Sequence, residues 1–181
     1  IDEIVMKSVN AGVHAWNWTT GRTKADLSSL LAITSSATIS VGAAIRGGIT
    51  ESIPTSILLG IWSLAVYHKN KHKERIEKSY ENSESLPFEI AQYNRLDKAL
   101  GYYLSIINVP LFCLTPFAPE EEKTNCLLTY SGGLQMSASF LSMCAENPPR
   151  RKDCVRRGID KLTEIIKNYR TKPALQPIPI R

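Results

Sequence analysis

The chain has 181 residues, of which 43% are hydrophobic and 22% are charged, as in an ordinary folded domain with a real core. A mean hydropathy of −0.14 argues against a protein made mainly of membrane spans, but it allows one hairpin in lipid. The net charge of +5 and pI of about 9.0 favour an anionic partner such as phospholipid or nucleic acid, with a mildly basic surface as the alternative.

The first segment predicted to fold is residues 1–18. Its apolar side chains recur at spacings of three and four, which is typical of one face of an α-helix. They are Ile4, Val5, Val9, Val13 and Trp16. Thr23 and Asp26 then have the spacing of a capping box, in which two side chains satisfy amide groups at the start of a helix. We therefore predict a second helix over about residues 24–45.

Two long uncharged segments form the centre of the sequence. Leu27–Ile45 and Ser52–His68 contain no Asp, Glu, Lys or Arg, and a six-residue turn, Arg46–Glu51, separates them. Gly47-Gly48 is expected to end the first helix, because glycine readily adopts a positive φ. The pattern predicts a helical hairpin over residues 23–80, either buried in a bundle or inserted in a bilayer.

Small residues recur every four positions in the first uncharged segment. This spacing places them on one helix face, where small side chains allow another helix to approach closely. The segment is also rich in serine and threonine, which weaken a helix in water but suit a packed interior or a bilayer. The predicted helix-packing residues are Ala32, Ser36, Ser40 and Ala44.

An amphipathic helix is predicted over residues 86–107. Its outer face is expected to carry Arg95, Asp97 and Lys98. Residues 109–119 contain three prolines, which interrupt helices, so we expect an irregular apolar connector there.

The C-terminal part is predicted to hold two more helices, over about residues 119–145 and 150–170. Residues 171–181 contain three prolines and are expected to form an extended tail. Residues 1–170 are therefore predicted to be one all-α domain of about six helices, in a bundle around the central hairpin.

Catalytic and metal-binding motifs are not recognisable in the sequence. His68 and His72 lie one helical turn apart, as two metal ligands would, but Lys69, Lys71 and Lys73 surround them and repel a cation. The four cysteines form no C-x-x-C pair. We therefore predict no catalytic residue, no metal site and no cofactor.

Basic residues form two clusters. The first, Lys69–Arg75, directly follows an apolar segment, which favours contact with an anionic lipid surface; we call it the basic patch. Neither cluster matches a nucleic-acid-binding signature, and solvated helix ends are the alternative. The residues predicted to bind an anionic surface are Lys69, Lys71, Lys73, Arg75, Arg150, Arg151, Arg156 and Arg157.

Three functional hypotheses follow. The first is a membrane-associated, non-catalytic structural or interaction subunit of a larger assembly, with other protein subunits and an anionic membrane surface as partners. The basic residues on both sides of the hairpin would place both termini on the cytoplasmic or matrix side. The second is a soluble intracellular all-α module that binds protein or nucleic acid through a basic face. The third is an enzyme with no recognisable motif.

Overall fold

A computed structural model describes residues 2–80 and 88–146, which belong to one compact unit, Ile1–Asn147. Within these ranges the chain has four α-helices, one short 3₁₀ helix and no strand, so the all-α prediction is confirmed. The structure has four α-helices in this part of the chain rather than the predicted total of about six, because the two arms of the hairpin are counted as one helix interrupted at Gly48 and the predicted total includes the helix over 150–170. The helix expected over 150–170 and the tail over 171–181 lie outside the described residues.

Helix α1 (Asp2–Thr20) starts with two acidic residues, which stabilise the positive end of the helix dipole. It ends before Gly21, whose φ of 69° glycine adopts without strain. The predicted capping box is confirmed. The Thr23 hydroxyl accepts from the Asp26 amide at 3.3 Å, and the Asp26 carboxylate accepts from the Thr23 amide at 3.2 Å.

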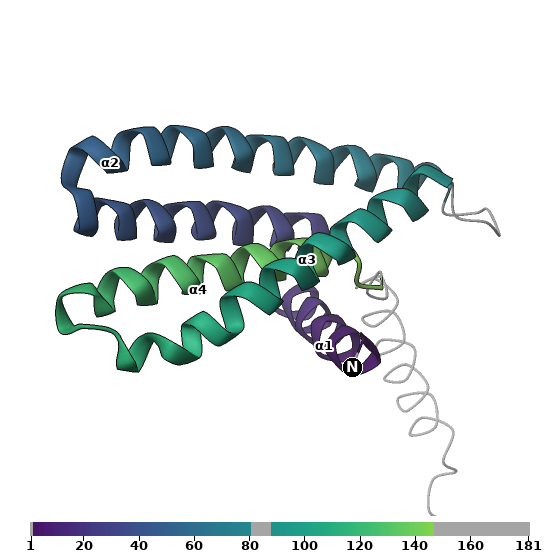
Figure 1. The fold of residues 1–181 in the computed structure, drawn as a ribbon. Helices are drawn as coiled ribbons and strands as arrows, with labels where there is room; N and C mark the ends of the chain where they lie inside the picture. The colour runs from purple at the N-terminus through teal and green to yellow at the C-terminus, as the bar shows by residue number, and fades with distance from the viewer. Residues whose placement is uncertain (1, 81–87, 147–181) are drawn as a thin grey trace, which may run out of the picture. The chain divides into compact units, whose positions relative to one another are not determined.

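Helix α2 (Lys24–Ser79) folds back on itself as the predicted hairpin (Figure 1). The expected six-residue turn is wrong, because Gly48 alone leaves the helical conformation, with φ 62° and ψ −152°. A Cβ atom on Gly47 would lie 2.0 Å from Glu51 Cδ, so a larger residue there would displace the exposed Glu51 side chain. We call residues 24–47 the first arm and residues 49–79 the second arm.

A second hairpin follows, made of α3 (Phe88–Leu114), the 3₁₀ helix η1 (Thr115–Phe117) and α4 (Glu120–Met143). The irregular connector expected over 109–119 is wrong, because α3 continues through Pro110 to Leu114. Proline removes one helical amide donor and its ring crowds the carbonyl four residues earlier, but a long helix can continue through it, and the Pro110 ring is exposed on the outside of α3. The prolines therefore allow a long helix and a tight turn.

The first arm packs antiparallel against α4. The hydroxyl of Ser35 donates to the Gly132 carbonyl at 2.7 Å. A Cβ atom on Gly132 would lie 3.2 Å from the Ser35 carbonyl oxygen, so the two backbones approach closely. The contacts recur every seven residues on both helices, pairing Ser28 with Ser139, Ser35 with Gly132, and Gly42 with Asn125.

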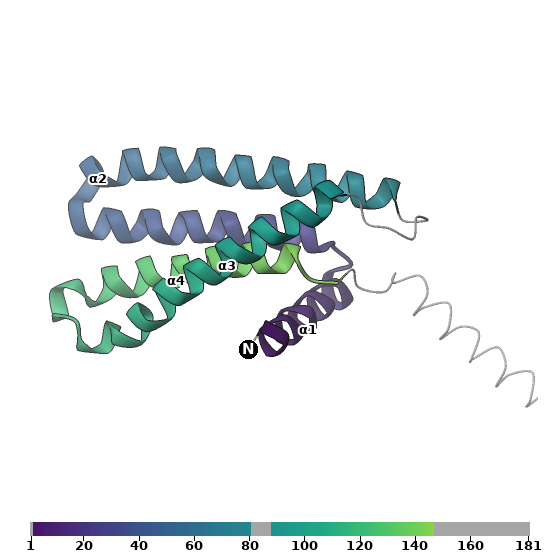
Figure 2. The same ribbon diagram turned by 45° about the vertical axis from the view of Figure 1, so that its right-hand side comes forward.

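The first arm packs against the second arm through the neighbouring positions. Ser36 and Ser63 share a hydrogen bond of 2.6 Å between their hydroxyls. Seven residues further from Gly48 on both arms, Asn70 Nδ2 donates to Ser29 Oγ at 3.3 Å. Adjacent helical residues point about 100° apart. The first arm therefore lies between the second arm and α4, with two different faces in use (Figures 1 and 2).

Helix α3 packs on the other side of α4, again through small and polar residues. Ser137 Oγ donates to the Gly101 carbonyl at 2.6 Å and lies 2.5 Å from Ser105 Oγ. A Cβ atom on Gly133 would lie 2.1 Å from Asn108 Oδ1. Figure 2 shows α3 crossing α4 obliquely, so that its N-terminal end reaches toward the end of the second arm.

Candidate functional site

Large apolar side chains cover the outside of the two hairpins. Leu58 on the second arm is 68% exposed and Ile106 on α3 is 73% exposed, whereas Ala32, Ser35 and Ser139 in the interior are 0% exposed. A water-soluble bundle has the opposite distribution, with its large apolar side chains inside. The outer surface therefore suits an apolar environment.

Threonine hydroxyls on the outward-facing side of the helices donate to backbone carbonyls of their own helix. Thr34 Oγ1 donates to the Leu30 carbonyl at 3.0 Å, and Thr38 Oγ1 donates to the Thr34 carbonyl at 2.8 Å. Thr55 does the same with the Glu51 carbonyl at 2.8 Å. Such back-bonding satisfies the hydroxyl within its own helix, so that it needs no partner on another helix.

Acidic and basic side chains are confined to the two ends of the hairpins. The turns carry Arg46, Glu51 and residues 120–123, and both turns lie at the same end in Figure 1; we call them the tips. The opposite end, which we call the base, carries the charges of residues 24–26, 69–78 and 95–98. Four segments between them contain no Asp, Glu, Lys or Arg: 27–45, 52–67, 99–119 and 124–145.

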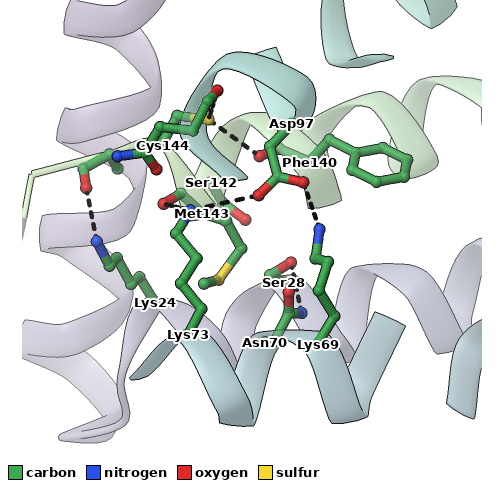
Figure 3. A network of polar contacts seen from close by, with 12 residues as sticks. Lys24, Ser28, Lys69, Asn70, Lys73, Asp97, Phe140, Ser142, Met143 and Cys144 are labelled. Carbon is green, nitrogen blue, oxygen red and sulfur yellow. Dashed lines mark hydrogen bonds and ion pairs between the residues drawn. The ribbon is translucent and has the colours of Figure 1, made fainter. Parts of the chain in front are cut away.

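The base contains a buried site in which two lysines share one carboxylate (Figure 3). Lys73 Nζ lies 3.3 Å from Asp97 Oδ2, and Lys69 Nζ donates to Asp97 Oδ1. The side chains of Lys73 and Asp97 are 0% and 1% exposed. The prediction that Asp97 faces outward is wrong, because α3 crosses α4 and turns this face toward the basic second arm.

The lysines of this site also bind the C-terminal end of α4. Lys73 Nζ donates to the Met143 carbonyl at 3.1 Å, and Lys24 Nζ donates to the Ala145 carbonyl and to Glu77, both at 3.1 Å. The last carbonyls of a helix lack intrahelical donors and form the negative end of its dipole, so ammonium groups stabilise them. We call Lys24, Lys69, Lys73, Glu77 and Asp97 the lysine–aspartate cluster.

Electrostatics at the base differ between buried and exposed groups. Burial lowers the pKa of Lys24, and the nearby Glu77 partly offsets this effect. At the edge of the base, Lys71 Nζ lies 2.8 Å from Asp26 Oδ1, and this bond raises the pKa of Lys71. Burial tends to raise the pKa of Asp26, but hydrogen bonds from Lys71 and Thr23 outweigh it and lower that pKa.

The basic patch is divided between the interior and the surface. Lys73 is buried, Lys69 lies with its Nζ 4.9 Å from the centre of the Phe140 ring, and Lys71 binds Asp26, whereas Arg75 is exposed. Binding of these residues to an anionic surface stays a prediction. The other residues of that prediction, Arg150, Arg151, Arg156 and Arg157, lie outside the described residues.

The predicted packing stripe coincides only in part with the contacts. Ala32 and Ser36 lie against the second arm, Ser40 is half-buried and Ala44 is exposed. Sequence reasoning missed the stripe that meets α4. A seven-residue spacing in both segments was the signal for it, with the small residues Ser28, Ser35 and Gly42 in the first arm and Asn125 followed by the small residues Gly132 and Ser139 in α4.

Comparison of the chain with protein-family models, curated proteins and solved structures gives no match. The outer surface and the base are therefore the features from which a function follows.

Proposed function

We propose that this protein is a membrane-associated helical subunit with a structural or assembly role and no catalytic activity. The observation that carries the proposal is the distribution of side chains in the hairpins. Small and hydroxyl-bearing residues fill most of the interior between the helices, many large apolar residues face outward, and buried large apolar side chains such as Ile90, Phe140 and Met143 lie toward the base. Lipid hydrocarbon removes the penalty for exposing apolar groups, and helices in a bilayer associate through small residues and interhelical hydrogen bonds.

Length and hydropathy support the same environment. Two helical stretches, Lys24–Ser79 and Phe88–Phe117, are long and apolar enough to cross a membrane. The most apolar 18-residue segments of the two stretches have mean hydropathies of 1.5 and 1.4. The core helix of a water-soluble protein meets the same criterion, but such a helix is mostly buried. In these two segments, only 33% and 11% are buried inside the protein.

The base supports a structural role rather than a catalytic one. Every lysine of the lysine–aspartate cluster is engaged with a carboxylate, and two of them also bind carbonyl groups at the end of α4. A buried charge held in this way joins helices and offers no free base or nucleophile. The cluster therefore stabilises the packing of the first arm, the second arm, α3 and α4 against one another.

Alkaline carbonate extraction tests the proposal. We expect the full-length protein to stay in the membrane pellet after a carbonate wash and to enter the supernatant only with detergent, as an integral membrane marker does. A peripheral protein in the same preparation should be released and serves as the control. Release of the protein without detergent would contradict the proposal and support the soluble protein- or nucleic-acid-binding module.

A further inference from the structure

We infer that α3 and α4 form a second membrane-spanning hairpin, so that the described unit crosses the bilayer four times, with both tips on one side and the base on the other. The inference rests on the proposed membrane association and adds its topology. Lipid hydrocarbon then covers the outer face of α3, and the lysine–aspartate cluster lies near one bilayer surface.

The register between the first arm and α4 supports a membrane-spanning α4. The two helices remain in contact from Ser28 against Ser139 to Gly42 against Asn125, which is about 21 Å of helix at 1.5 Å per residue. The contacts are hydrogen bonds between buried groups and close backbone approaches. If the first arm crosses the bilayer, α4 therefore crosses beside it.

The outer face of α3 supports a membrane-spanning α3. Residues 99–119 contain no charge, and their α-helical part, residues 99–114 of α3, is about 24 Å long, which covers most of the hydrocarbon core. The exposed apolar side chains along it are Tyr103, Ile106, Ile107, Val109, Leu114 and Phe117. An apolar face of this length, continued by η1 at the turn, fits lipid along most of the depth of the bilayer.

The polarity of α4 agrees with this topology. Its hydroxyl groups are satisfied inside the protein, since Ser139 Oγ donates to the Ser28 carbonyl at 2.8 Å and Ser137 Oγ to the Gly101 carbonyl at 2.6 Å. A helix that lies between two others needs no apolar outer face. Helix α4 is therefore an inner span, although its composition is less apolar than that of α2 and α3.

The charges at the two ends give the orientation. The tips contain two basic residues, Arg46 and Lys123, against four glutamates, whereas the second arm alone brings five basic residues to the base. Loops rich in lysine and arginine remain on the cytoplasmic side or the equivalent matrix side. The base therefore faces the cytoplasm or matrix, and both tips face the opposite compartment.

Cysteine labelling in sealed membrane vesicles tests the topology of the second hairpin. All native cysteines are replaced by alanine, and single cysteines are introduced by Gln92→Cys at the start of α3 and Glu121→Cys at the start of α4; both positions are exposed. An impermeant maleimide should label one of the two before the vesicles are permeabilised and the other only afterwards. Labelling of both from the same side would overturn the inference.

A matched pair on α2 separates this outcome from failure of membrane insertion itself. Thr50→Cys at the first tip should behave like Glu121→Cys, and Lys78→Cys at the base should behave like Gln92→Cys. If the α2 pair is labelled from opposite sides while the α3–α4 pair is labelled from one side, the four-span topology is wrong and membrane insertion stands. If the protein is released by carbonate, the proposed membrane association fails first.

A second readout retains the native cysteines. A glycosylation acceptor sequence with flexible flanks is inserted after Glu121, and the chain is synthesised in the presence of microsomes. With the tips on the lumenal side we expect an increase in mass that a glycosidase removes. An unmodified chain that is inserted in the membrane would contradict the inferred orientation.

Discussion

Lys73 and Asp97 form an ion pair in the interior of the base, with Nζ 3.3 Å from Oδ2 and both side chains almost completely buried. The pair joins the second arm to α3, two elements that otherwise have few contacts with each other. Removing one member of a buried pair leaves an uncompensated charge, which costs about 3–5 kcal/mol. We therefore expect a single substitution of either residue to be strongly destabilising.

The first prediction concerns Asp97→Asn. It leaves two lysines without their shared carboxylate, so we expect a loss of about 3–5 kcal/mol in the free energy of unfolding. Thermal or denaturant unfolding in detergent micelles measures this loss. Asp2→Asn is the control, because Asp2 pairs with Lys98 at the surface, where water screens the pair, so we expect a much smaller loss. Equal losses for both variants would contradict the structural role of the buried pair.

The second prediction concerns close contact between the first arm and α4. Gly132→Ala places a Cβ atom 2.5 Å from Ile39 Cγ1 and 3.2 Å from the Ser35 carbonyl oxygen, so we expect a loss of about 1–3 kcal/mol. Gly12→Ala and Gly60→Ala meet no atom within 4 Å and should be neutral or stabilising by up to about 1 kcal/mol. The three melting temperatures test this order. A Gly132→Ala protein as stable as the controls would show that the helices lie further apart.

The third prediction compares two substitutions on the same arm. Ser36→Leu inserts a large side chain between the arms, where the Ser36 hydroxyl lies 2.6 Å from that of Ser63, so we expect the melting temperature in micelles to fall by several degrees. Thr34→Leu changes an exposed position on the outer face and should leave the melting temperature within experimental error. Tolerance of leucine at both positions would mean that the arms do not pack as described.

The fourth prediction is a pH dependence at the edge of the base. The hydrogen bonds from Lys71 and Thr23 lower the pKa of Asp26 below its ordinary value of 3.8, so the folded state favours the carboxylate. This contribution to stability is complete above pH 3.8 and is lost as the pH falls through the lowered pKa. Asp26→Asn should therefore reduce stability at pH 7 and flatten its decline in acid. An unchanged acid titration of stability in Asp26→Asn would contradict this assignment.

The hairpin and its cap could be predicted because their signals are local. The Thr23–Asp26 capping box and the two uncharged segments depend on neighbours within one or two turns. The continuation of α3 through Pro110 could not be predicted from the general effect of proline, because the rest of a long helix can outweigh the lost hydrogen bond and the crowding that one proline causes. The mean hydropathy of the whole chain also gave no sign of the apolar outer surface. The serines and glycines of an inner helix such as α4 offset the leucines and isoleucines of the outer helices in that average.

The candidate site was the least predictable part. The basic patch was visible, but its partition between a buried Lys73 and an exposed Arg75 depends on the face that the second arm turns toward Asp97. That face is set by the packing of the first arm, and residues distant in sequence determine it. The seven-residue spacing of Ser28, Ser35 and Gly42 does carry this information, because it identifies the side of the arm that α4 occupies.

Spin labels on the outer surface test membrane embedding most directly. A label introduced by Leu58→Cys on the second arm or Ile106→Cys on α3, in a protein reconstituted into phospholipid vesicles, should relax faster with oxygen than with a water-soluble nickel complex, because oxygen concentrates in hydrocarbon. A label at Thr50→Cys on the tip should show the reverse. Faster relaxation by nickel at Leu58→Cys and Ile106→Cys would mean that the outer surface faces water and that the protein is not embedded in the bilayer.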